Sequence, residues 1–336
     1  MNKRNVWLGS LLMLVWSLNV GLAQTKPGNA KDNKMPTPPI ATEPIILETP
    51  TGKIYGTLLL PKSTKSLPVA IIIAGSGPTN RDGNSPAIPG ANNSLKYLAE
   101  GLAAQGIATL RFDKRGVGES VNALAKEEDI RFDHYIDDVV LWGQKLRADK
   151  RFSTLTIIGH SEGSLIGMVA AQKLKANAYV SIAGTGRSMV TVLQEQLKPA
   201  LPPDVFAQAD AIMKELVAGN TVKNVPPGLA ALFRPSVQPY IISWFKYDPA
   251  SEITKLKIPV LIAQGTHDLQ VKIEDARALA QAKPDAKLLV VEGMNHVLKA
   301  TPAEREKQLK SYSDPELPVV PELIAAISKL SKAAKK

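Results

Sequence analysis

The residues with the clearest chemical potential form the segment GHSEG at positions 159–163, in which a serine stands between two glycines. An apolar run at residues 155–158 precedes it, and a helical pattern follows it. In a G-x-S-x-G segment placed between a strand and a helix, the sharp turn exposes the serine oxygen, and the glycines keep neighbouring side chains away. Ser161 is therefore predicted to be a nucleophile, the alternative being a serine that caps the following helix.

A serine nucleophile needs a histidine that accepts its proton. The chain has four histidines, and only His296 follows both the serine and the last predicted strand. His160 neighbours the serine, but we expect its side chain to point elsewhere, and His134 lies in a predicted helix before the nucleophile. The fourth, His267, adjoins an aspartate. We predict His296 as the general base.

The histidine in turn needs a carboxylate that orients it. Asp268 lies four residues beyond a predicted strand that ends at Gln264. Ser161, Asp268 and His296 would then emerge from three strand ends on one edge of a sheet, where open α/β sheets bind ligands. The alternative for Asp268 is a turn or helix-capping role, which is common for aspartate.

Attack on a carbonyl carbon also needs hydrogen-bond donors for the oxyanion that forms. We expect the backbone N–H of Glu162, directly after the nucleophile, to be one donor, and that of Ser76, in the loop after an earlier strand, to be the other. The glycines on either side of Ser76 would let this loop approach a substrate, although they are equally typical of a simple turn.

The elements that must position these groups follow a regular alternation of short β-branched runs and amphipathic helical patterns, which predicts an α/β fold with a mainly parallel sheet covered on both faces. The first two strands should form an antiparallel hairpin. The expected strands are residues 44–48, 53–60, 69–74, 107–112, 155–158, 178–183, 259–264 and 287–292, and the expected helices are residues 94–104, 132–146, 164–175 and 273–283.

Other segments depart from this alternation. Residues 1–23 combine two basic residues with an apolar run and a small-residue end, which indicates a signal peptide and a periplasmic or secreted protein, the alternative being an uncleaved anchor. Residues 24–44 predict a proline-rich linker, and residues 331–336 a basic tail. Residues 184–258 hold helical patterns without a strand and predict a helical cap, inserted into a core of residues 45–183 and 259–330.

Composition excludes several classes of protein. The chain has no cysteine, so disulfides and thiolate chemistry are excluded. Its net charge of +10 is concentrated near the two ends, and no basic stripe interleaved with aromatics predicts nucleic-acid binding. None of the G-x-G segments is completed to a dinucleotide-binding pattern, and no P-loop or H-E-x-x-H motif occurs, so no cofactor or metal is expected.

Five segments carry a resemblance to a known family. They are GHSEG, AGSGPTNRDG at residues 74–83, RFDKRGVGES at 111–120, GTHDLQV at 265–271 and MNH at 294–296. Taken together, they resemble motifs of the α/β-hydrolase superfamily and, within it, of bacterial serine carboxylesterases of the EstD type, with serine aminopeptidase-like hydrolases as relatives. The resemblance spans residues 45–330. It implies an eight-stranded sheet, a helical cap, no cofactor, and hydrolysis of short-chain acyl esters of small molecules.

Alternatives remain open at this point. A serine peptidase or amidase would use the same groups, and a catalytically silent protein of this fold could bind ligands only. A group of charged residues at the strand ends is interpreted as bracing two loops rather than binding substrate. Aromatic residues in the expected cap would either line an acyl pocket or pack on the core. The charged residues are Arg81, Asp82, Asp113 and Arg115. The aromatic residues are Phe233, Tyr240, Trp244, Phe245 and Tyr247.

Overall fold

The computed structural model describes residues 39–335, so the expected signal peptide and most of the expected linker lie outside the described residues. The strands are β1 (Ile40–Thr49), β2 (Gly52–Pro61), β3 (Leu67–Ile73), β4 (Ala108–Phe112), β5 (Phe152–His160), β6 (Ala178–Ile182), β7 (Val260–Gly265) and β8 (Lys287–Val291). The longer helices are α1 (Ser94–Ala104), α2 (Phe132–Ala148), α3 (Glu162–Leu174), α4 (Met189–Leu197), α5 (Pro203–Val217), α7 (Gln238–Phe245), α9 (Ile273–Ala282) and α11 (Pro321–Ala333).

The strands form one eight-stranded sheet in the order β1-β2-β4-β3-β5-β6-β7-β8. β1 and β2 form the antiparallel hairpin that the sequence predicts, and β2 pairs antiparallel with β4. From β4 to β8 every neighbouring pair is parallel. The carboxyl ends of these six strands therefore meet at one edge of the sheet, and the loops that leave them build the site.

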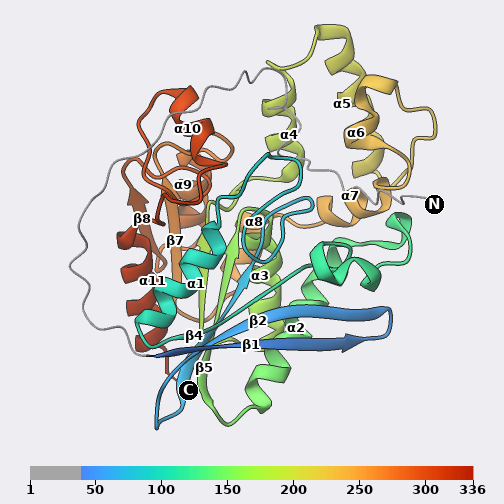
Figure 1. The fold of residues 1–336 in the computed structure, drawn as a ribbon. Helices are drawn as coiled ribbons and strands as arrows, with labels where there is room; N and C mark the ends of the chain where they lie inside the picture. The colour runs from blue at the N-terminus through green and yellow to red at the C-terminus, as the bar shows by residue number, and fades with distance from the viewer. Residues whose placement is uncertain (1–38, 336) are drawn as a thin grey trace.

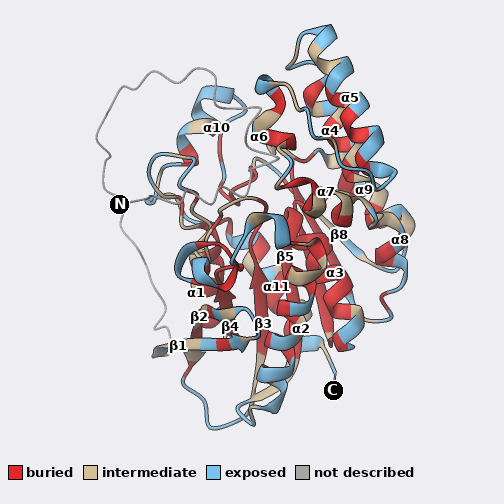
Figure 2. Cartoon of the chain, turned by 90° about the vertical axis from the view of Figure 1, so that its right-hand side faces the viewer, coloured by how far each residue is buried: buried red, intermediate tan, exposed pale blue. Residues whose placement is uncertain are grey.

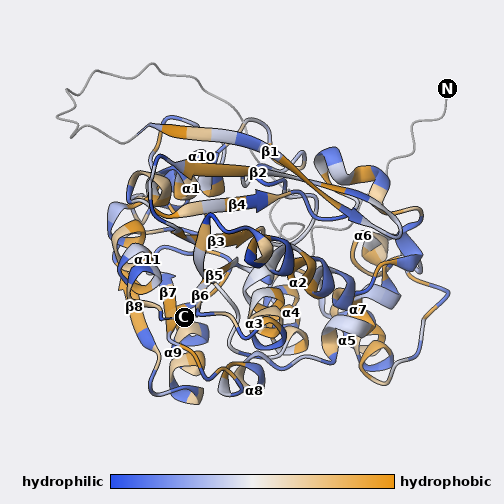
Figure 3. Ribbon diagram, turned by 90° about the horizontal axis from the view of Figure 1, so that it is seen from below, coloured by the Kyte–Doolittle hydropathy of each residue, from blue (hydrophilic) through white to orange (hydrophobic). Residues whose placement is uncertain are grey.

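Helices cover both faces of the sheet, as Figure 3 shows with the strands seen from below. Side chains alternate along β3: Ile71 packs with α2 and α3 on one face, and Ile72 packs with α1 and α11 on the other. This period of two is what a strand buried on both faces requires. Figure 2 shows the central strands buried along most of their length. The hydrophobic core thus consists of two layers, one on each side of the sheet.

Between β6 and β7 the chain forms only helices, among them the short α6 (Ala230–Phe233) and α8 (Pro249–Thr254). Figure 1 shows α4, α5, α6 and α7 grouped beyond one end of the sheet. α4, α5 and α7 contact one another, whereas α8 contacts α3 and α9, which cover the sheet. Within the interval expected to be a cap, the cap-like group is therefore α4 to α7.

Two expected boundaries are wrong. β1 begins at Ile40, so residues 40–44 are strand and not linker, and Pro44 stands opposite Thr57. Proline is tolerated there because β1 is an edge strand. The expected basic tail also overlaps α11, which continues to Ala333 and buries Ser331. α10 (Arg305–Ser311) is a helix that no sequence pattern predicted. Among residues 39–335, no helix combines the length and apolar character needed to cross a membrane.

Candidate active site

Ser161 occupies the turn between β5 and α3 with φ 56° and ψ −123°, a region that side-chain-bearing residues rarely adopt. The strain is maintained because the turn is closely packed. A Cβ atom on Gly159 would lie 2.1 Å from the Gly163 carbonyl oxygen, and one on Gly163 would lie 2.5 Å from the Ile73 carbonyl oxygen. The backbone N–H of Ser161 donates to Ile182 at 2.9 Å. Only glycine therefore fits at these two positions, because backbone atoms of neighbouring segments lie where a Cβ atom would be.

His296 and Asp268 lie in the loops after β8 and β7, and the Nδ1 atom of His296 is 2.9 Å from the Oδ2 atom of Asp268. The other carboxylate oxygen, Oδ1, accepts the backbone N–H groups of Gln270 at 2.8 Å and Val271 at 3.0 Å. Burial raises the pKa of Asp268, but His296 and these hydrogen bonds outweigh it and hold that pKa below its ordinary value. A charged carboxylate facing Nδ1 favours the tautomer with the proton on Nδ1, which leaves Nε2 as an acceptor.

Ser161 and His296 line the same small cavity, whose volume is about 40 Å³. Ser76, from the loop after β3, also lines it, whereas Asp268 lies behind His296. Several of the lining residues were not predicted as part of the site, because neither their residue type nor their place in a motif indicates a contact with the cavity. These are Thr79, Ser85, Ile88, Asn92, Ser94, Gln270, Val297 and Tyr312.

The side chain of His160 faces the site, so the expectation that it points elsewhere is wrong. It lines the cavity, its Nε2 atom lies 2.8 Å from the carbonyl oxygen of His296, and the two rings are 4.7 Å apart. Burial, together with the neighbouring His296, lowers the pKa of His160 to about 3. The neutral ring therefore donates its Nε2 proton to the backbone of His296 and holds that loop in place.

The remaining histidines serve other contacts. The Nδ1 atom of His267 lies 2.7 Å from the carbonyl oxygen of Thr301. His134 accepts the backbone N–H of Arg131 at the start of α2. Neither residue lines the cavity.

The pKa of His160 leads to a testable pH dependence of stability. An unfolded histidine takes up a proton below about pH 6.5, whereas folded His160 stays neutral down to about pH 3. The unfolded state therefore binds more protons in this window, and stability falls as the pH decreases from 6.5 towards 3. His160→Gln, whose amide can still donate to His296, should flatten this loss by up to about 1.4 kcal/mol per pH unit.

Urea unfolding of the wild type and of His160→Gln, measured at several values between pH 4 and pH 8, tests this expectation. Comparing the two proteins at each pH cancels the contributions of groups that they share. Two stability curves that run parallel across the whole range would show that His160 is not the titrating group.

The backbone N–H groups of Ser76 and Glu162 have no hydrogen-bond acceptor within residues 39–335. Both residues are buried, with exposed fractions of 7% and 5%. Buried N–H groups without a partner are rare because each one carries a desolvation penalty. Two such donors, one beside the nucleophile and one on the cavity wall, are suited to an oxyanion.

The four charged residues at the strand ends form separate ion pairs. Arg81 binds Asp113 through its side chain at 2.8 Å and through its backbone N–H at 2.7 Å, which joins the loops after β3 and β4. Asp82 pairs with Arg111. Arg115 pairs instead with Asp138 on α2. The bracing interpretation is therefore confirmed for Arg81 and Asp113, and Arg115 connects its loop to a helix.

Three of the aromatic residues between β6 and β7, Tyr240, Trp244 and Tyr247, pack against α2. The Trp244 ring stacks on Phe132 with centroids 5.6 Å apart, and Tyr240 contacts Tyr135 edge-on at 5.8 Å. Phe233 is fully buried. None of the five aromatics lines the cavity at Ser161. Packing, one of the two interpretations of these residues, is the one that the structure supports.

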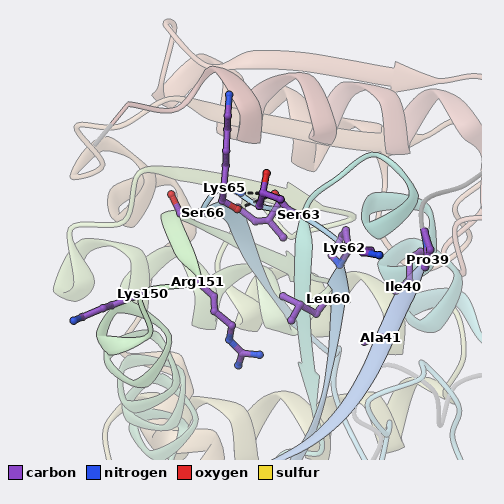
Figure 4. Close-up of a pocket in the computed structure, with 13 residues that line it drawn as sticks. Pro39, Ile40, Ala41, Leu60, Lys62, Ser63, Lys65, Ser66, Lys150 and Arg151 are labelled. Atoms are coloured by element: carbon purple, nitrogen blue, oxygen red, sulfur yellow. Dashed lines mark hydrogen bonds between the residues drawn. The ribbon is translucent and has the colours of Figure 1, made fainter.

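A larger hollow, of about 740 Å³, lies elsewhere, along β1, β2 and the segment that joins β2 to β3. Figure 4 shows lysines and Arg151 around it. Ser161 and His296 are not among its lining residues. The residues that the sequence predicts for catalysis thus surround the smaller cavity and not the larger one. Within the described chain, no cluster of three or more His, Asp or Glu side chains could hold a metal ion.

This mostly parallel eight-stranded sheet, with a serine in the strained turn after a central strand, defines an α/β-hydrolase fold. Solved structures confirm the fold. Est1E from Butyrivibrio proteoclasticus, solved with bound ferulic acid, aligns with a TM-score of 0.56 at 18% identity, over 86% of this chain and 99% of that one. The Pyrococcus furiosus esterase Pf2001 aligns with a TM-score of 0.52 at 16% identity, over 88% and 93%.

Sequence comparisons confirm the resemblance to esterases of the EstD type. The family model for serine aminopeptidase, S33, matches residues 91–223. Esterase EstD of Thermotoga maritima is 28% identical over 263 residues, which are 75% of this chain and 61% of that protein. The non-heme chloroperoxidase CPO-A1 of Kitasatospora aureofaciens is 25% identical over 234 residues, 60% of this chain and 79% of its own length. The chain thus resembles hydrolases of the EstD type, and it spans less than two thirds of EstD itself.

Proposed function

We propose that the protein is a serine hydrolase that cleaves short-chain carboxylic esters through Ser161, His296 and Asp268. One observation carries the proposal: a histidine oriented by a buried carboxylate shares a small cavity with a serine held in a strained turn. The EstD resemblance supports the same activity.

In the proposed reaction, the Oγ atom of Ser161 attacks the ester carbonyl carbon, and Nε2 of His296 takes the hydroxyl proton. The N–H groups of Ser76 and Glu162 stabilise the oxyanion. When the tetrahedral intermediate collapses, the bond to the alcohol oxygen breaks, and His296 gives its proton to that oxygen. Water then attacks the acyl-enzyme in the same way, which releases the acid and restores Ser161.

The choice of an ester over a peptide with a free amino terminus follows from the lining of the cavity. Its side chains are hydroxyls, amides, imidazoles and apolar groups. Such surroundings suit a neutral acyl group better than an ammonium group, which carboxylates would stabilise. Turnover of p-nitrophenyl acetate and butyrate, compared with aminoacyl p-nitroanilides, tests this choice. Faster turnover of the anilides would identify a peptidase instead.

The small cavity also predicts a preference for short acyl chains. We expect turnover of p-nitrophenyl esters to be highest between acetate and butyrate and to fall for longer acids. Ile88, a half-buried apolar residue of the cavity wall, limits the space. Ile88→Ala should move the preference towards longer chains, by about tenfold in relative kcat/KM for one or two added methylenes.

Trp244→Phe is the matched control for this series, because Trp244 packs on Phe132 and does not line the cavity. It should leave the chain-length profile unchanged. A profile that shifts with Trp244→Phe but not with Ile88→Ala would place the acyl group under the helices between β6 and β7 instead.

A further inference from the structure

A buried ion pair lies directly behind the proposed oxyanion donors. Lys114, in the loop after β4, places its ammonium group 2.7 Å from a carboxylate oxygen of Glu162, the residue after the nucleophile. Both side chains are 2% exposed. Burying such a pair costs several kcal/mol of desolvation per ion, so an ion pair alone is weak evidence of a stabilising role. Its other contacts indicate what it does.

The same ammonium group donates to the carbonyl oxygen of Gly75 at 2.6 Å. This carbonyl and the N–H of Ser76 belong to one peptide group. Because a trans peptide is planar, its C=O and N–H bonds point in opposite directions. Fixing the carbonyl oxygen of Gly75 against Lys114 therefore fixes the direction of the Ser76 N–H on the other side of the plane.

Helix α7, one of the cap-like helices, adds a further contact to the Lys114–Glu162 ion pair. The hydroxyl group of Tyr240, on α7, donates to the second carboxylate oxygen of Glu162. Burial, together with the charge of Glu162, raises the pKa of Tyr240 well above its ordinary value, so the phenol keeps the proton that it donates. The ammonium group of Lys114 also lies over the Tyr135 ring, 4.8 Å from its centroid. One connected set of contacts thus joins α7, the nucleophile turn and the loop after β3.

We propose that Lys114, with the side chains of Glu162 and Tyr240, is the positioning device of the oxyanion hole and couples it to helix α7. The proposal rests on the proposed function and adds residues that the Ser-His-Asp arrangement does not include. Lys114 does not touch the substrate. It holds the Gly75–Ser76 peptide group directly, through the Gly75 carbonyl oxygen, and it holds Glu162 through that residue's side chain. Its loss should therefore reduce stabilisation of the transition state more than it reduces substrate binding.

The variants are chosen so that the chain still folds. Lys114→Met alone would leave the Glu162 carboxylate buried without its cation, which is strongly destabilising. Lys114→Met combined with Glu162→Gln removes the charge and the contact to Gly75, while it keeps the backbone N–H of residue 162 and an acceptor for Tyr240. Tyr240→Phe removes only the hydroxyl group and keeps the aromatic packing.

For p-nitrophenyl butyrate, the double variant should lose about 10- to 100-fold in kcat with KM within about twofold, less than the 10²- to 10³-fold loss on removing an oxyanion donor entirely. Tyr240→Phe should lose about three- to tenfold, because it acts through Glu162. A trifluoromethyl ketone, whose adduct with serine carries an oxyanion, supplies a second measurement. Its Kd should rise by the same factor by which kcat/KM falls.

Asp138→Asn is the matched control, because it breaks a buried ion pair with Arg115, the residue next to Lys114. This variant should lower stability and leave kcat and ketone affinity unchanged. The inference is overturned if the wild type hydrolyses esters and the double variant keeps its kcat and ketone affinity, or if Asp138→Asn loses as much of both. If the wild type hydrolyses no ester, the proposed function itself fails.

Discussion

Ser161→Ala is expected to reduce ester turnover by about 10⁶-fold, the loss found when the nucleophile of a related triad is removed. The reason is that the acyl-enzyme cannot form, while the cavity and the oxyanion donors remain. The measurement is kcat for p-nitrophenyl butyrate, together with labelling by an organophosphonate, which should modify the wild type at this serine and leave the variant unmodified.

The strained backbone at Ser161 supplies a control for the same experiment. Alanine must keep the φ of 56°, whereas glycine adopts it without strain. Ser161→Gly should therefore be as inactive as Ser161→Ala but more stable, by on the order of 1 kcal/mol. Near-normal turnover in either variant, or phosphonate labelling at another residue, would contradict the proposed mechanism.

His296→Ala should be about as damaging as Ser161→Ala, because the serine and its base act as one unit. Asp268→Asn should reduce turnover by about 10⁴-fold for a different reason. Two backbone N–H groups hold Oδ1 of Asp268, so the amide oxygen of asparagine would take that place and its NH₂ group would face Nδ1 of His296. Nδ1 would then accept, and the proton would move to Nε2, where it blocks attack by the serine.

Kinetics of single and double variants check these roles. Ser161→Ala combined with His296→Ala should be no slower than either single variant. His267→Ala, whose histidine bonds to Thr301 outside the cavity, is the control and should keep most of its turnover. Loss of activity in His267→Ala with tolerance of His296→Ala would show that the wrong histidine has been assigned.

Much of the fold could be predicted because its signals are local. Each strand of the parallel part is a short apolar run, and α1 has the bounds that the pattern of Leu95, Leu98 and Leu102 indicates. The residues proposed for catalysis could be located because each follows a strand whose end lies at the same edge of the sheet. The start of β1 was missed because prolines suggest a linker, and only pairing with β2 shows that this segment is an edge strand.

The surroundings of the site were harder to predict because they depend on contacts between distant segments. The His160 ring reaches the loop of His296, 136 positions later in the chain. Tyr312, directly after α10, lines the cavity, and its hydroxyl oxygen accepts a hydrogen bond from the side-chain amide of Gln270. The role of Lys114 had one local signal, a cation at the end of β4 inside the motif at residues 111–120. Its partner Glu162 could be identified only from the folded structure.

The order of the strands has a consequence for how the protein becomes active. β6, β7 and β8 follow one another both along the chain and across the sheet, and the loops after the last two carry Asp268 and His296. A nascent chain that has been synthesised only as far as β6 contains Ser161 but neither His296 nor Asp268. Catalytic competence would therefore arrive late, with the docking of β7 and β8, and enzyme turnover would report the completion of folding rather than its onset.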